Sequence, residues 1–355
     1  MAAESSPWSF RGLVSSAKRL ALNTSPAPMT KLFAKTDPEV DGEECLHDCE
    51  TCTVKYPRNF QINTGDELYG FVKGWETHLL VATSKTDWVR DVEDEKGSVM
   101  EAMGSAKSPT NGKLKLSASN IPTPSGSANY DEPTSVLLLP AFTFIDNVTP
   151  QRVPTLIDSF INNAPTNTMP LGPFTLPKSL PPPAVADDNV PPMTSRPCPH
   201  QVLVLLCSQK TRDARCGQSA PLLKKELERH LRPLGLYRDL DDERPGGVGI
   251  YFISHVGGHK YAANMMVYRR RNAFGLDAIE RAKSGQEVRP TVPTSQGKGE
   301  EEEEDEGAAQ CIWLARVKPD DIENIVRYTV LQGKVVKPES QLRGGFDREK
   351  GLLSW

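Results

Sequence analysis

The stretches HQVLVLLCSQKTRDARCG, residues 200–217, and GVGIYFISHVGGHKYAAN, residues 247–264, decide how this chain is organised. Each opens with a short apolar run rich in β-branched residues, which is typical of a buried β-strand. Two cysteines follow the first run and two histidines follow the second, namely Cys207, Cys216, His255 and His259. Two thiols and two imidazoles, each pair at the end of a strand, predict a metal site with four ligands.

The ligand types and their spacing narrow the choice of metal. Thiolate and imidazole suit zinc or an iron–sulfur cluster, whereas magnesium and calcium prefer oxygen ligands. Eight residues separate the two cysteines, whereas zinc fingers keep theirs about two to four apart. Two cysteines with two histidines are the Rieske pattern of ligation. Gly257 and Gly258 lie between the histidines and allow both rings to turn toward one metal. We therefore predict a [2Fe–2S] cluster on these residues.

The strings CSQKTRDARCG and HVGGHKYAAN resemble those of the fungal and plant sucrase/ferredoxin-like family. The resemblance is strong over residues 202–317 and weaker over residues 45–145. It implies that the C-terminal half is a thioredoxin-like ferredoxin, with a [2Fe–2S] cluster held by Cys207, Cys216, His255 and His259. The expected function is one-electron transfer, coupled to a proton through the imidazoles, to a partner protein that the sequence does not name. A redox protein is favoured over an enzyme with its own substrate.

Two other functions stay open. The same four ligands could hold zinc as the structural staple of an interaction module. Upstream, CLHDCETC contains Cys45, Cys49 and Cys52, and the pair Cys49 and Cys52 has the spacing of a thiol oxidoreductase. The spacing of all three cysteines also matches radical-SAM enzymes, but no strand-like run precedes them and Thr51 stands where an aromatic residue is usual. Solvent-exposed or loosely metal-binding cysteines are therefore expected here.

Two arginines, Arg212 and Arg215, lie between the cysteines. They could stabilise the thiolates or contact a redox partner. The alternative is that both are loop residues facing solvent, and the sequence favours neither interpretation.

Composition limits the class of protein. At 355 residues the chain suits two domains, and 30 prolines among them indicate long linkers. A net charge of −4 argues against nucleic acid as a partner. No apolar run reaches the roughly 18 residues that a membrane helix needs. Seven cysteines without a secretory signal indicate a reducing compartment. We expect a cytoplasmic location, with a mitochondrial one as the alternative.

The expected fold is α/β with two thioredoxin-like units. The expected segments are a disordered arm or presequence (1–43), a degenerate thioredoxin-like domain (44–162), a proline-rich linker (163–199), the ferredoxin domain (200–333) with a disordered acidic insertion (272–310), and a C-terminal tail (334–355). THLLVATSKTDWVRDVE, from residue 77, is similar to HQVLVLLCSQKTRDARC, which suggests an internal duplication with Thr83 in the place of Cys207.

Local patterns predict further elements. SVLLLPAFTFID (135–146) is expected to be a strand, and residues 104–133 a surface loop. SAPLLKKELERHLRPLG predicts a helix with Ser219 as its N-cap and His230 packed on one face. NMMVYRRR and CIWLARV predict an antiparallel pair in which Cys311 is buried, and PDDIENIVRYTVL predicts the closing helix.

The chain ends in Leu353, Ser354 and Trp355, after a tail with no periodic apolar face. This tripeptide resembles the C-terminal signal by which the cytosolic iron–sulfur targeting complex recognises proteins that receive clusters. It implies that complex as a partner and favours maturation in the cytosol. The alternative is that Trp355 packs against the folded domain.

Overall fold

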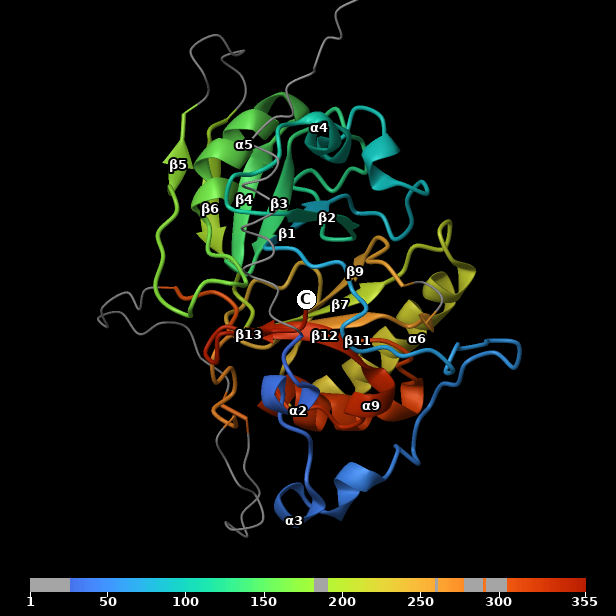
Figure 1. Ribbon diagram of the computed structural model, residues 1–355. Helices are drawn as coiled ribbons and strands as arrows, with labels where there is room; N and C mark the ends of the chain where they lie inside the picture. The colour runs from blue at the N-terminus through green and yellow to red at the C-terminus, as the bar shows by residue number, and fades with distance from the viewer. Residues whose placement is uncertain (1–25, 182–190, 259–260, 278–289, 292–304) are drawn as a thin grey trace, which may run out of the picture.

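One mixed β-sheet organises the molecule in the computed structural model, which describes residues 26–181, 191–258, 261–277, 290–291 and 305–355 (Figure 1). Within these ranges the strand order is β13-β12-β11-β10-β7-β9-β2-β1-β3-β4-β6-β5, and β8 pairs with β9. The strands are β1 (Thr77–Ala82), β2 (Leu114–Ser119), β3 (Thr134–Leu139), β4 (Thr143–Val148), β5 (Ser179–Leu180), β6 (Met193–Pro197), β7 (Val202–Cys207), β8 (Tyr237–Arg238), β9 (Val248–Ile253), β10 (Met265–Arg269), β11 (Gln310–Leu314), β12 (Leu342–Asp347) and β13 (Leu352–Leu353).

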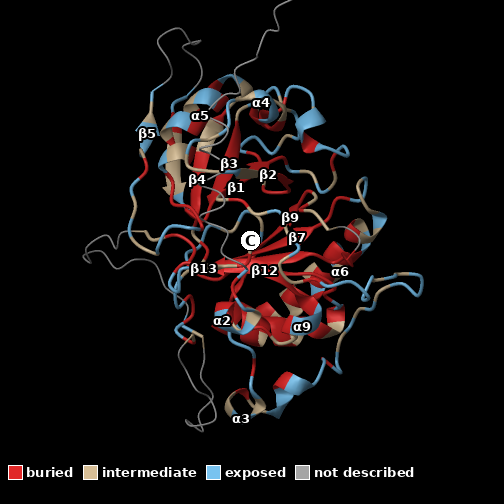
Figure 2. Cartoon of the chain, in the orientation of Figure 1, coloured by how far each residue is buried: buried red, intermediate tan, exposed pale blue. Residues whose placement is uncertain are grey.

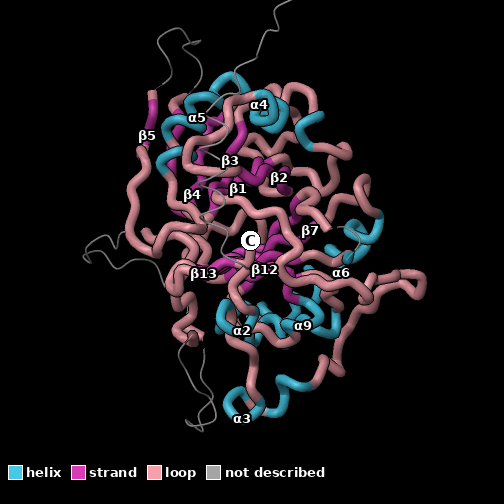
Figure 3. Tube along the Cα trace, in the orientation of Figure 1, coloured by secondary structure: helices cyan, strands magenta, loops and turns pink. Residues whose placement is uncertain are grey.

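Helices flank the sheet, and long loops join the elements (Figure 3). The α-helices are α2 (Met29–Leu32), α3 (Pro38–Asp41), α4 (Val99–Ser105), α5 (Val153–Ser159), α6 (Ala214–Leu231), α8 (Ile322–Asn324) and α9 (Pro338–Gln341). Shorter turns are η1 (Glu43–Leu46), η2 (Val92–Asp94), η3 (Pro150–Arg152), η4 (Ile161–Asn163), η6 (Pro319–Asp321) and the π-helical η7 (Ile325–Val330). No helix of the described ranges is both long and apolar enough to cross a bilayer.

Each half of the sheet repeats one pairing pattern. In the first half, β1 pairs in parallel with β2 and antiparallel with β3, which pairs antiparallel with β4. In the second half, β7 pairs in parallel with β9 and antiparallel with β10, which pairs antiparallel with β11. A helix, α4 or α6, links each parallel pair, as parallel neighbours require. An internal duplication predicts this repetition, although the thioredoxin-like character of each unit stays a prediction.

The two halves meet at β2 and β9. Ser119 and Ile253 pair antiparallel, and the buried Asn120 extends the contact. The backbone N–H of Asn120 donates to the Phe252 carbonyl at 3.1 Å, and the Phe252 N–H donates to Asn120 Oδ1 at 2.7 Å. The sheet is therefore continuous across the boundary between the two halves.

Apolar packing also crosses this boundary. One buried cluster joins Leu80 and Leu137 of the first half to Leu205, Met266 and Trp313 of the second. Strands in this part of the sheet are buried on both faces, as Figure 2 shows in red, because helices and loops cover them. The Val- and Leu-rich runs of the sequence reflect this double burial.

Several predicted elements are confirmed. THLLVAT forms β1, HQVLVLL forms most of β7, and GVGIYFIS forms β9. NMMVYRRR and CIWLARV form the antiparallel pair β10 and β11, in which Cys311 is buried. PDDIENIVRYTVL is helical through η6, α8 and η7.

Other predicted boundaries are wrong. Helix α6 begins at Ala214, not after Ser219, because Asp213 caps it by accepting the N–H of Arg215. Residues 135–146 form two strands, β3 and β4, with a turn around Pro140. The expected loop over 104–133 contains β2, which lies between β1 and β9 at the centre of the sheet.

Segments expected to lack structure are partly ordered. Residues 26–43 contain α2 and α3, and Leu32 and Phe33 are buried in the core. Residues 1–25 lie outside the described ranges, as do 182–190 of the proline-rich linker. The rest of that linker contributes β5 and β6, which lie at the sheet edge where prolines are tolerated.

The tail and the insertion also depart from expectation. The tail forms β12 and β13, and the unbroken burial of β12 arises because it lies beside β11. Most of the acidic insertion, 278–289 and 292–304, lies outside the described ranges. Its last two acids do not remain unpaired: Asp305 pairs with Arg270, and Glu306 pairs with Arg271 at 3.3 Å.

Candidate metal centre

The sheet brings predicted ligands together at one edge. Strands β7 and β9 run in parallel, and Cys207, the last residue of β7, is in register with Ile253, the last residue of β9. His255 follows two residues later and therefore emerges beside Cys207. The carboxyl ends of parallel strands share one edge of a sheet, which is where α/β proteins place their binding sites.

Helix α6 supplies the third of these residues. Cys216 lies in the first turn of the helix and is fully buried. The N-terminus of a helix carries partial positive charge, which favours a thiolate over a thiol. Cys207 comes from β7, Cys216 from the helix that follows it, and His255 from the loop after the neighbouring strand.

The thiol of Cys207 contacts both the Cys216 thiol and the His255 imidazole. The hydrogen bond from Cys216 lowers the pKa of Cys207 to about 5, and His255 acts in the same direction against the effect of burial. The pKa of Cys216 moves upward, because its proton is held in the bond to Cys207 and because it is buried. The bond between the two thiols therefore moves their pKa values in opposite directions.

The loop between these ligands is fastened to the first half of the molecule. Gln209 Oε1 accepts the N–H of His255 at 2.8 Å, while its Nε2 donates to the Val89 carbonyl at 2.5 Å. Thr211 Oγ1 donates to Asp87 at 2.8 Å. The half without the predicted ligands thus holds the loop that carries Cys207 and Cys216 in the other half.

The two arginines of this loop contact neighbouring segments. Arg212 Nη1 donates to the Arg90 carbonyl at 3.0 Å. Arg215 pairs with Asp213 at 2.8 Å and donates to the Gln61 carbonyl at 3.0 Å. The charge of Arg215 also favours the ionised form of Cys216. These contacts fit the thiolate-stabilising interpretation for Arg215, whereas for Arg212 they show a role in holding the loop.

Two cations that the motif did not indicate approach the site. Burial and the neighbouring Arg343 lower the pKa of Lys115, on β2, to about 8, and the negative charge of Cys207 opposes that shift. Burial lowers the pKa of Arg343, on β12, to about 10, with Tyr261 and Cys207 opposing. Arg343 Nη1 donates to the Gly257 carbonyl at 2.9 Å, so it also holds the histidine loop.

Glycines are needed in that loop. Gly257 and Gly258 have φ of 89° and 67°, a left-handed conformation that other residues adopt at a cost. A Cβ on Gly258 would also meet the guanidinium of Arg343. His259, the fourth predicted ligand, lies outside the described ranges.

Aromatic rings continue from the site to the end of the chain. The Arg343 guanidinium lies 4.1 Å from the Trp313 ring, and Trp313 lies 5.3 Å from Trp75. Trp355 stacks on Trp75 at 4.5 Å, and its Nε1 donates to the Trp75 carbonyl at 3.3 Å. Leu353 pairs with Phe346, and Ser354 is fully buried. The terminal tripeptide is therefore packed against the domain in this structure.

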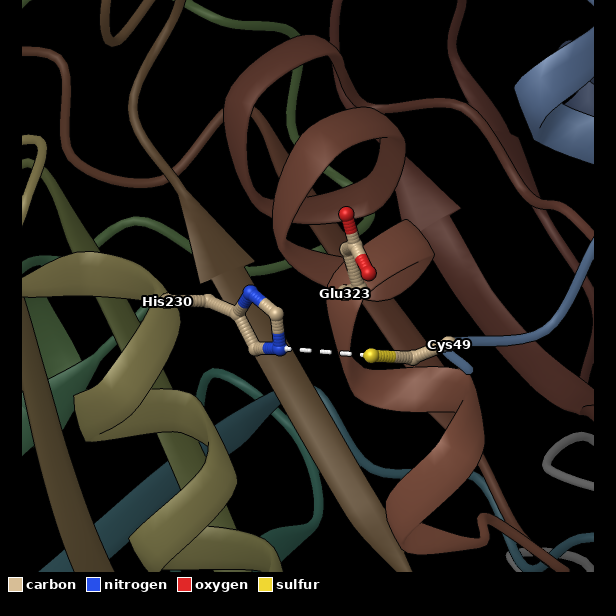
Figure 4. Close-up of side chains that lie close together, drawn as sticks. All are labelled: Cys49, His230 and Glu323. Atoms are coloured by element: carbon tan, nitrogen blue, oxygen red, sulfur yellow. Dashed lines mark hydrogen bonds between the residues drawn. The ribbon is translucent and has the colours of Figure 1, made fainter. Parts of the chain in front are cut away.

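A separate group of donor atoms includes one of the upstream cysteines. The Sγ of Cys49, an imidazole nitrogen of His230 and a carboxylate oxygen of Glu323 lie within 4.8 Å of one another (Figure 4). His230 was expected to be a packed helix residue, and no pattern in the sequence predicted that Cys49 would lie beside it. The segment around Cys49 and Cys52 has neither a preceding strand nor a following helix. Burial raises the pKa of the Cys52 thiol to about 11, which disfavours thiol chemistry there.

Comparison with known proteins decides the family. The family model described as sucrase/ferredoxin-like matches residues 68–344, more than half of the chain. This chain belongs to the sucrase/ferredoxin-like family. The match includes Cys207, Cys216, His255 and His259, and also both halves of the sheet.

Curated relatives agree with this assignment. Actin patches distal protein 1 of Saccharomyces cerevisiae is 31% identical over 260 residues, covering 67% of this chain and 76% of that protein. Altered inheritance of mitochondria protein 32 of Clavispora lusitaniae is 30% identical over 138 residues, covering 39% of this chain and 33% of that protein. The protein of the same name from Debaryomyces hansenii is 29% identical over 135 residues, covering 38% of this chain and 33% of that protein. No solved structure matches the chain significantly.

Proposed function

We propose that this family member holds a [2Fe–2S] cluster on Cys207, Cys216, His255 and His259 and transfers single electrons to a partner protein. The convergence of Cys207, Cys216 and His255 at one sheet edge is the observation that carries the proposal. When bound, such a cluster accepts and releases one electron at a potential that its ligands set.

The residues around the ligands suit this role. Cys207 and Cys216 supply negative charge, whereas a neutral His255 adds none, which favours a higher potential than four thiolates give. Lys115 and Arg343 place positive charge near Cys207 and stabilise the thiolate. Burial of both cysteines excludes water from the sulfur atoms. His255 is partly exposed, which supports the proposed coupling of electron transfer to a proton.

Loss of the cysteine ligands gives the first prediction. A double variant with Cys207→Ser and Cys216→Ser should lose the red-brown colour, iron and acid-labile sulfide of the purified protein. Cys311→Ser is the matched control, because Cys311 is equally buried in the sheet but ends no ligand loop. Full iron and sulfide content in the double variant would place the cluster elsewhere.

The same set of variants tests the histidines. His255→Cys should keep the cluster and lower its potential toward that of all-cysteine ferredoxins, near about −400 mV. A redox titration measures this shift. An unchanged potential with the cluster intact would exclude His255 as a ligand, and a colourless wild-type protein holding zinc would favour the structural alternative.

The C-terminal tripeptide supports a proposal about maturation. We propose that Trp355 is a handle for the cytosolic iron–sulfur targeting complex and that the protein acts in the cytoplasm. Because the Trp355 ring stacks on Trp75, it must separate from Trp75 before a partner protein can bind it. Relatives named for altered inheritance of mitochondria keep the mitochondrial location open as the alternative.

We therefore expect deletion of Trp355 to have different effects in cells and in vitro. Cluster occupancy of the protein isolated from cells should fall severalfold, while chemical reconstitution in vitro still succeeds. Trp75→Leu is the control, because it loosens the stacking yet leaves the terminus available. Equal occupancy in cells with and without Trp355 would contradict the proposed handle.

A further inference from the structure

Three donor atoms from distant parts of the chain converge beside α6. Cys49 comes from the segment after η1, His230 from the last turn of α6 and Glu323 from α8, and the ring and the sulfur face each other in Figure 4. Cys49 Sγ lies 4.0 Å from His230 Nε2. Cys49 is 9% exposed, so this sulfur is withdrawn from solvent.

Backbone contacts hold this arrangement in place. The N–H of Cys49 donates to the Asp320 carbonyl at 2.9 Å. Asn324 Nδ2 donates to the His47 carbonyl at 2.8 Å, and the N–H of Thr53 donates to Glu226 Oε1 at 3.0 Å. The segment from His47 to Thr53 is thus anchored on both sides of Cys49, which orients the thiol before any ligand binds.

A positive charge already lies between the donor atoms. Arg229 Nη2 is 3.3 Å from Cys49 Sγ and 3.0 Å from His230 Nε2. Lone pairs of both atoms therefore point toward one cationic nitrogen. The fully buried Glu226 accepts a hydrogen bond from Arg229 Nε at 2.7 Å. The guanidinium therefore keeps a partner when Nη2 leaves Cys49 and His230.

From this convergence we propose that Cys49, His230 and Glu323 form a zinc site, for which Arg229 competes. Thiolate, imidazole and carboxylate are the ligands that zinc takes in proteins, and three of them leave a fourth position for water. On binding, the thiol of Cys49 loses its proton to the buffer, and the guanidinium keeps its bond to Glu226 while Nη2 turns away from the sulfur and the imidazole. Glu323 also pairs with Arg327 at 3.2 Å, and only one carboxylate oxygen is needed for the metal.

The site would fasten the upstream cysteine segment to α6 and α8. This role does not depend on the cluster at Cys207 and Cys216, which lie at the other end of α6. It assigns Cys49 a function that neither electron transfer nor thiol chemistry requires. It also gives the segment a connection whose strength depends on the zinc concentration.

Zinc titration of the full-length protein, in competition with a chromophoric chelator, tests the proposal. The wild type and the Cys207→Ser, Cys216→Ser variant should share one zinc equivalent that Cys49→Ser and Glu323→Gln lack. Arg229→Gln should bind that equivalent about tenfold more tightly, because the competing charge-assisted hydrogen bonds are removed. Zinc should also slow trypsin cleavage after the exposed Lys55 and Arg58.

Two results would overturn the proposal. One is an unchanged zinc equivalent in both Cys49→Ser and Glu323→Gln, and the other is equal or weaker zinc binding by Arg229→Gln. Glu323 is partly exposed, so its variant folds even where Cys49→Ser does not. Visible absorption recorded on the same samples separates this outcome from failure of the cluster proposal.

Discussion

Two cysteines in contact with each other ionise differently in this protein. The hydrogen bond between them lowers the pKa of Cys207, which contacts His255 and lies near Lys115. The same bond and burial raise the pKa of Cys216, although it lies in the first turn of a helix. The direct bond acts against the helix dipole, whose effect is about 0.3–1 kcal/mol at most exposed sites.

His200 makes the stability of the fold depend on pH. Burial lowers its pKa from 6.5 to about 4, and neighbouring Arg238 adds to the shift. The unfolded chain therefore takes up a proton near pH 6.5, whereas the folded protein resists it until about pH 4. The stabilisation is present above pH 6.5 and is lost as the pH falls, by roughly 3 kcal/mol between pH 7 and pH 4.

Urea unfolding at a series of pH values measures this loss. In His200→Phe the free energy of unfolding should fall less steeply between pH 6.5 and pH 4. The comparison is of slopes, because the fully buried His78, whose pKa burial also lowers, contributes to both proteins. Parallel pH profiles for the two proteins would show that His200 is not the group responsible.

At the scale of elements, the start of α6 positions the candidate ligands. Asp213 caps the helix by accepting the N–H of Arg215, which fixes the turn that carries Cys216. Asp213→Ala should lower the free energy of unfolding by about 1 kcal/mol. Asp213→Asn is the control, since an asparagine oxygen can accept the same bond. Equal losses in the two variants would show that the charge, not the cap, matters.

The local sequence could predict the strands and the helix but not where the helix starts. Ser219 with a proline two residues later has the pattern of a helix N-terminus, because Pro221 would then lie in the first turn. The structure instead extends the helix over Pro221 back to Ala214, because capping by Asp213 and burial of Cys216 favour the longer helix. Capping and packing thus outweigh the local preference for a helix start at Ser219.

The ligand motif could be predicted, whereas its surroundings could not. The convergence of Cys207 and His255 follows from two strand ends, because a strand fixes where its last residue lies, whereas Cys216 joins them from the first turn of α6. Lys115 and Arg343 come from β2 and β12, which were expected to be loop and irregular tail. β12, LRGGFD, has no period-two alternation and is buried throughout. β2, LKLSAS, does alternate apolar and polar residues, but the Ser-, Pro-, Asn- and Gly-rich residues around it favoured a loop.

At the scale of the whole molecule, the two halves should unfold together. Sheet pairing and the shared apolar cluster both cross the boundary at Asn120. Asn120→Ala leaves the buried N–H of Phe252 without its partner, which should cost about 1–3 kcal/mol. Calorimetry should show one transition for the wild type at a higher temperature than for the variant.

The exposed Asn59 provides the control for this measurement, because Asn59→Ala removes an amide of the same kind away from the boundary. Its transition should coincide with that of the wild type. Two separate wild-type transitions would show that the halves are independent, as the division into two domains joined by a linker had suggested.

The anchoring of the ligand loop on residues 86–90 bears on how the chain can be recombined. Gln209 and Thr211 donate hydrogen bonds to Val89 and Asp87, more than a hundred residues earlier in the chain. The two segments should therefore come from the same relative when proteins of the family are recombined. A chimera that takes residues 200–355 from one relative and the preceding part from another separates the ligand loop from the segment that anchors it. Transplanting residues 86–90 along with the C-terminal part should restore a chimera that the simpler crossover inactivates.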